Sequence, residues 1–148
     1  MIFSRIPELT ALFLAVIVAS LLKLPFYYFI HRRWNWALVF GTGGMPSSHS
    51  ALIVSTTLAI GLFRGFDQPL FALAVAMSMI VIYDAAGVRR QAGIHAERIN
   101  MIIKEIFEGR PLEEKDLKEM LGHSPIEVMG GVIVGILCAL FLYLVLPK

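Results

Sequence analysis

The stretch VMGGVIVGILCALFLYLVL, residues 128–146, contains no charged residue and indicates the class of fold. A helix that crosses a bilayer needs about 20 mostly apolar residues, and this segment is almost that long. Three further runs are similarly apolar: 9–30 has one charge, Lys23, and 50–63 and 69–83 have none. The 148 residues are 57% hydrophobic and 16% charged, with a mean hydropathy of +0.74. This composition leaves too little polar surface for a soluble helical bundle.

We therefore predict an all-α polytopic membrane protein that forms a single domain over residues 1–148. Runs of about 20 residues around the apolar segments define four transmembrane helices. These are expected near residues 8–30, 46–63, 69–88 and 125–146.

The segment 89–124 is the largest piece outside the predicted membrane helices. Its first half has a helical apolar face with charged residues between its members. That face is formed by Ile99, Ile102, Ile103 and Ile106. We expect an amphipathic helix on the membrane surface or over the mouth of the bundle, followed by a short helix over 112–121.

Basic residues are distributed unequally between the two sides of this arrangement. Nine Lys or Arg lie in 31–45 and 89–124, against three in the N-terminal tip, the 64–68 turn and the C-terminus. Loops rich in Lys and Arg stay in the cytoplasm. We therefore expect a multi-pass cell-membrane protein with both termini outside and with 31–45 and 89–124 in the cytoplasm.

Polar and ionisable residues gather where the predicted helices begin or end on the cytoplasmic side. They are Lys23 and Arg33 from the first helix, Ser47, Ser48 and His49 from the second, Asp84, Arg89 and Arg90 from the third, and His123 and Glu127 from the fourth. Ionisable groups at membrane depth are costly, and most of them have a function. This end of the bundle is therefore the candidate site.

The residue types at this end are suited to phosphoryl transfer. Arg and Lys bind phosphate oxygens through charge and forked hydrogen bonds, and a glycine-rich loop before a helix adds backbone N–H groups. A neutral histidine can attack phosphorus, and a protonated one can donate a proton to the leaving oxygen. Glu127, four residues after His123, can orient that imidazole. The set predicts a phosphoryl-transfer site that needs no metal.

Two motifs resemble those of the integral-membrane type-2 phosphatidic acid phosphatases, in particular their divergent branch, in a superfamily that includes vanadium-dependent haloperoxidases. PSSH, residues 46–49, is similar to the family motif Pro-Ser-Gly-His. HSPIEVMGG, residues 123–131, resembles the second half of another family motif, with Glu127 in place of Asp. The first half of that motif is matched only by Arg89 and Arg90, ahead of the insert. The resemblance covers about residues 20–140, although the family's Lys and Arg-Pro motif is matched only loosely, by Lys23 and Arg32 or Arg33.

The resemblance implies an integral-membrane phosphatase that hydrolyses a lipid or isoprenyl phosphate or diphosphate through a phosphohistidine. His123 would be the nucleophile, Glu127 its orienting partner, and His49 the acid for the leaving group. The phosphate would be bound by Ser47, Ser48, Lys23, Arg33, Arg89 and Arg90.

Some assignments stay open at this point. His95 follows Arg89 at the family's spacing and is the alternative nucleophile. Asp84 is an accessory residue, either in an ion pair with Arg89 or Arg90 or in a shared metal or proton-relay site with Glu127.

We expect a lipid phosphate and membrane lipids as partners, and no nucleic acid. No cofactor is implied, and the sequence leaves open whether a divalent cation such as Mg²⁺ assists. Gly130, Gly131 and Gly135 allow close helix approach and suggest a homodimer of this thin bundle. The alternative function is a non-catalytic transporter or lipid-binding scaffold that uses the same basic pocket.

Overall fold

The computed structural model describes residues 6–40, 44–106 and 124–146. These ranges contain helices and no strand. In chain order the helices are α1 (Pro7–His31), α2 (Ala37–Phe40), α3 (Ser48–Arg64), α4 (Pro69–Ala86), α5 (Val88–Ile106) and α6 (Pro125–Val145).

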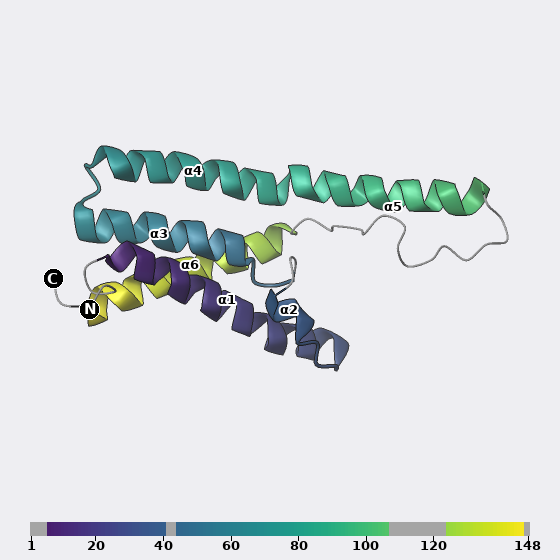
Figure 1. Ribbon diagram of the computed structural model, residues 1–148, viewed down its shortest axis with the longest axis horizontal. Helices are drawn as coiled ribbons and strands as arrows, with labels where there is room; N and C mark the ends of the chain where they lie inside the picture. The colour runs from purple at the N-terminus through teal and green to yellow at the C-terminus, as the bar shows by residue number, and fades with distance from the viewer. Residues whose placement is uncertain (1–5, 41–43, 107–123, 147–148) are drawn as a thin grey trace.

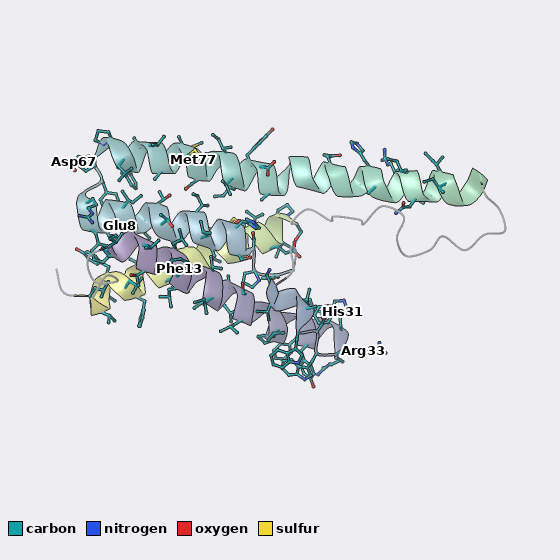
Figure 2. All side chains as sticks on the ribbon, viewed as in Figure 1. Glu8, Phe13, His31, Arg33, Asp67 and Met77 are labelled. Atoms are coloured by element: carbon teal, nitrogen blue, oxygen red, sulfur yellow. The ribbon has the colours of Figure 1, made fainter. Side chains whose placement is uncertain are left out.

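Helix α3 lies at the centre of the bundle and packs against α1, α4 and α6. Figure 1 shows α1 and α4 running in one direction and α3 and α6 in the other, with α5 continuing beyond the end of α4. The starts of α3 and α6 therefore lie at the same end of the bundle as the ends of α1 and α4. Figure 2 marks the two ends, with Glu8 and Asp67 at one and His31 and Arg33 at the other.

The four predicted membrane helices are all present as helices, with bounds within two residues of those expected. Three of them, α1, α4 and α6, are long and apolar enough to cross a bilayer. Helix α3 is shorter, with 17 residues, five of which carry hydroxyl groups. The described part of the chain thus contains three helices that meet the requirement for a span, rather than the four predicted.

The segment between the last two membrane helices begins with the expected amphipathic helix, α5, over Val88–Ile106. The short helix predicted over 112–121 lies outside the described residues. Helix α2 was not predicted, because its four residues are too few to show a helical repeat of apolar positions.

Local sequence sets most helix boundaries. Proline, which is favoured in the first turn because its missing N–H has no partner there, lies at the start of α1, α4 and α6. Serine caps α3 and α6 through Ser47 and Ser124, respectively. Gly87 separates α4 from α5, and its N–H donates to the Tyr83 carbonyl at 2.8 Å.

Small residues form the interior of the bundle. On the contact between α6 and α3, a side chain at Gly135 would place its Cβ 2.7 Å from the Ala51 carbonyl oxygen, so only glycine fits. On the contact between α1 and α3, Ala11 is buried and its carbonyl accepts the Ser55 hydroxyl at 3.0 Å. Large apolar side chains such as Phe13 instead point outwards. This arrangement suits a protein surrounded by lipid, where close backbone packing rather than the hydrophobic effect holds helices together.

The glycines of α6 pack within one chain. Gly131 and Gly135 are buried against α3, and Gly130 lies beside Met45 and Pro46. The glycine face on which the homodimer was expected is therefore already covered by the same chain.

A glycine-to-alanine pair tests this packing. A Cβ at residue 131 would overlap the Ser47 carbonyl oxygen, whereas a Cβ at residue 130 would meet the flexible end of Met45 at 3.3 Å. We expect Gly131→Ala to lower the free energy of unfolding by about 1–3 kcal/mol through overpacking. Gly130→Ala should be neutral or stabilising, because alanine favours the helix. Thermal unfolding of the two variants in detergent measures this, and equal melting temperatures would contradict it.

Candidate functional site

A backbone hydrogen bond joins the starts of α3 and α6. The Ser47 N–H donates to the Glu127 carbonyl oxygen at 2.9 Å. This bond connects the PSSH stretch, residues 46–49, to the first turn of α6, immediately after the segment that contains His123. The two stretches that carry the family resemblance are therefore in direct contact.

Ser47 is a structural residue of this site. It is 0% exposed, and its Oγ accepts hydrogen bonds from the Ser50 N–H at 3.4 Å and the Ser50 hydroxyl at 3.1 Å. Ser47 thus caps α3 rather than presenting its hydroxyl at the surface. The next two residues, Ser48 and His49, are half-buried and exposed, respectively, in the first turn of α3. They lie at the positive end of the helix dipole, which attracts anions.

Glu127 is held at the start of α6 by a capping box. Its Oε2 accepts the Ser124 N–H at 2.8 Å, and the Ser124 Oγ accepts the Glu127 N–H at 3.3 Å. These reciprocal bonds satisfy backbone donors that the helix leaves free. The residue before Ser124 in the sequence is His123. His123 itself lies outside the described residues.

Lys23 is the charged group of α1 at this level. The side chain is 2% exposed, and its ammonium is attracted electrostatically by the Glu127 carboxylate. A charge buried at membrane depth is costly unless an opposite charge compensates it. The attraction of the Glu127 carboxylate offsets part of this cost, and burial of the ammonium is the larger effect.

The other predicted residues are distributed around this centre. Asp84 is half-buried in the last turn of α4. Arg89 and Arg90 are the second and third residues of α5, near the same end of the bundle (Figure 1). His95 is exposed further along α5. Arg33 is exposed at the tip of α1, away from the starts of α3 and α6 (Figure 2), so the structure does not bring it to the centre.

Two serines at the site were absent from the sequence-based set. Ser124 caps α6, and Ser50 donates to Ser47. The spacing Ser124-x-x-Glu127 before an apolar run is a capping-box signature, so the sequence contained the signal for Ser124. Ser50 lacked such a signal, since its role depends on the burial of Ser47.

Within the described ranges, no three His, Cys, Asp or Glu side chains gather in the arrangement of a metal site. The described groups near the starts of α3 and α6 are the Lys23 ammonium, the Glu127 carboxylate and the N-terminus of α3, in whose first turn the His49 imidazole is exposed. These are groups that bind an oxyanion and move protons.

The model of the family described as "Divergent PAP2 family" matches residues 6–138, which include every described site residue. The chain belongs to the divergent PAP2 family. It is a membrane protein of that family, as its three long apolar helices indicate. It is 38% identical over 152 residues to "Uncharacterized membrane protein YuiD" of Bacillus subtilis (strain 168). The alignment covers 95% of this chain and 96% of that protein. No solved structure matches the chain significantly. The family resemblance drawn from residues 46–49 and 123–131 is thus confirmed.

A double-mutant cycle tests the interaction between Lys23 and Glu127. Lys23→Met leaves the Glu127 charge without its partner, and Glu127→Gln does the reverse while keeping a residue that supports a capping box. Because each single change uncovers a charge and the double change removes both, we expect the two effects to be non-additive by about 1–3 kcal/mol. Chemical unfolding in detergent provides the measurement.

The ion pair at the opposite end is the matched control for this cycle. Arg64 Nε donates to Glu8 Oε1 at 2.6 Å, but the Arg64 side chain is half exposed. Water screens such a pair, so Glu8→Gln and Arg64→Met should show a smaller coupling. Additive effects at Lys23 and Glu127 would contradict the proposed compensation.

Proposed function

We propose that this divergent PAP2 family protein is an integral-membrane phosphatase that hydrolyses a lipid or isoprenyl phosphate or diphosphate through a phosphohistidine intermediate. The observation that supports it best is the hydrogen bond between Ser47 and Glu127. Ser47 and Glu127 are 80 positions apart in the sequence and belong to two motifs that carry histidines. The bond between them brings these motifs to one end of the bundle. Membership of the family supports the same class of chemistry.

In the proposed reaction, the His123 imidazole attacks the terminal phosphorus atom, and the bond from this phosphorus to the leaving oxygen breaks. That oxygen is the lipid alcohol oxygen in a monophosphate and the bridging oxygen in a diphosphate. The His49 imidazolium donates a proton to that oxygen, so the lipid leaves as an alcohol, or as a monophosphate if the substrate is a diphosphate. Water then attacks the phosphohistidine while the neutral His49 accepts its proton. Inorganic phosphate leaves, and both histidines return to their initial states.

The remaining residues bind and orient. Glu127 holds the His123 imidazole and stabilises its positive charge. The first turn of α3 offers backbone N–H groups and the Ser48 hydroxyl to the phosphoryl oxygens. Arg89 and Arg90, at the start of α5, supply the positive charge that balances the phosphate. Lys23 contributes through Glu127, and the assay with and without a chelator tests whether a divalent cation assists.

The proposed topology follows the distribution of basic residues. Helix α3 is a fourth membrane-embedded helix, the site faces the cytoplasmic leaflet, and α5 belongs to a cytoplasmic insert. Lipid would enter sideways, with its phosphate towards the starts of α3 and α6 and its chains along the outward-facing apolar side chains.

Phosphate release tests the function directly. Purified protein in nanodiscs, given phosphatidic acid, isoprenyl phosphates and isoprenyl diphosphates with and without a chelator, should release inorganic phosphate and be inhibited by vanadate. His49→Ala and His123→Ala should each lower kcat by at least about 100-fold, since each removes a group that transfers a proton or attacks phosphorus. His31→Ala is the matched control, because His31 is exposed at the tip of α1 and should leave kcat unchanged.

Three other outcomes would revise this proposal. Full activity in both His49→Ala and His123→Ala would refute the mechanism. Loss of activity in His95→Ala but not in His123→Ala would assign the nucleophile to α5. Lipid movement across liposomes without phosphate release would favour the non-catalytic transporter.

A further inference from the structure

The apolar part of the bundle, between the polar groups at its two ends, is shorter than a bilayer is thick. The Glu8–Arg64 ion pair marks one end, and Lys23 with Glu127 marks the other. Glu8 and Lys23 are 15 positions apart on α1, which is about 22 Å at 1.5 Å per residue. The hydrocarbon core of a bilayer is about 30 Å thick. The distance between these two levels is therefore about 8 Å less than the thickness of the hydrocarbon core.

The other helices give a similar length. Helix α3, from Ser48 to Arg64, has 17 residues and measures about 25 Å. From Glu127 to Val145 there are 18 positions, or about 27 Å. Helix α1 as a whole has 25 residues, or about 37 Å, and extends furthest beyond the required thickness.

The extra length of α1 ends in a group of stacked rings. Tyr27 and His31 have ring centroids 4.2 Å apart, Tyr28 and Trp34 4.7 Å, and Trp34 and Trp36 6.3 Å. We call these five residues the aromatic collar. On α1 its members lie about 6 Å (Tyr27) to about 12 Å (His31) beyond Lys23, and Trp34 is stacked on Tyr28, five positions from Lys23.

The exposure of the collar indicates what surrounds it. Trp36 is 69% exposed, and Ile30, on the turn between collar residues, is 72% exposed. Side chains of this size are costly to leave in water. Tyrosine and tryptophan accumulate at the membrane–water interface, where one part of the ring system is apolar and the other is hydrated. The exposed Arg32 and Arg33 beside them match the negative phosphates of lipid headgroups.

We propose that the bilayer surface at this end lies at the aromatic collar, and that Lys23, Ser47 and Glu127 lie about 6–12 Å below it, inside the membrane. Helix α3 then begins within the bilayer, which accounts for its short length. Irregular backbone at such depth requires internal hydrogen bonds. The structure provides them: the Ser47 N–H donates to Glu127, and the Ser47 carbonyl accepts the Ala51 N–H at 3.1 Å.

The depth of the site has a consequence for the ligand, which rests on the proposed phosphatase function. A phosphate can reach this level only if a hydrocarbon chain holds it in the membrane and no large polar group accompanies it below the headgroups. Water-soluble phosphate esters, and lipids whose phosphate is attached to a sugar, should be poor ligands because their polar groups would lose water.

Fluorescence depth measurements on the full chain test the position of the site. Trp34 and Trp36 are the two tryptophans of the sequence, so intrinsic fluorescence reports the collar. In a Cys138→Ala background, Ile126→Cys places a fluorophore beside Glu127, at a position that is 70% exposed. Leu144→Cys, near the end of α6, marks the opposite surface and is the control. The protein is reconstituted in vesicles that contain lipids brominated at defined depths.

Tryptophan and the label at 144 should be quenched best by shallow bromines, and the label at 126 by bromines about 7 Å deeper. Iodide in the water should quench tryptophan but not the label at 126. The proposal would be overturned if the label at 126 and the tryptophans lay at equal depth in both thin and thick bilayers. It would also be overturned if the label lay closer to the membrane surface than the tryptophans. These measurements need no catalysis. A protein that shows the depth difference but releases no phosphate would refute the proposed function and leave the depth of the site intact.

Discussion

A single backbone hydrogen bond, from the Ser47 N–H to the Glu127 carbonyl, lies where α3 and α6 approach most closely. The approach is possible because Gly131 and Gly135 have no side chain at the contact, and lipid provides no hydrophobic force that would favour bulkier packing. The relative position of the two family-like stretches, residues 46–49 and 123–131, depends on this contact. A larger residue at 131 would separate the helix starts, and with them any groups that act together on one phosphate.

The polar groups around this contact are satisfied by the protein itself. Ser47 is completely buried between Ser50 and Glu127, Glu127 caps its own helix, and the Glu127 carboxylate attracts the buried Lys23 ammonium. Such internal pairing is what a low-dielectric surrounding demands. It is consistent with a site that lies below the membrane surface. It also explains why α3 carries hydroxyl groups and fewer residues than its neighbours, since it does not have to cross the whole bilayer.

The sequence predicted the helices well, because charge-free runs of this length have few alternatives to a membrane helix. It also predicted that the polar residues meet at one end, because the direction of the chain alternates between helices. It did not predict that Ser47 is hidden, that Lys23 faces Glu127, or that Gly131 packs within the chain. These facts depend on which face of each helix turns inward. The spacing of small residues does not show whether they pack against a helix of the same chain or against a second copy. In the sequence, a lysine that is buried looks the same as a lysine that binds a ligand.

Cross-linking between the two helix starts measures the central contact most directly. A Cβ at Gly130 would lie 3.7 Å from Met45 Cγ, the atom whose place the sulfur takes in Met45→Cys, so this variant combined with Gly130→Cys, in a Cys138→Ala background, should bring the two thiols close enough for a disulfide. Mild oxidation of native membranes should link this pair nearly completely. It should not link Met45→Cys with Met129→Cys, because Met129 is exposed on another face of α6. Failure of the first pair, or equal linking of both, would show that the starts of α3 and α6 do not meet in this way.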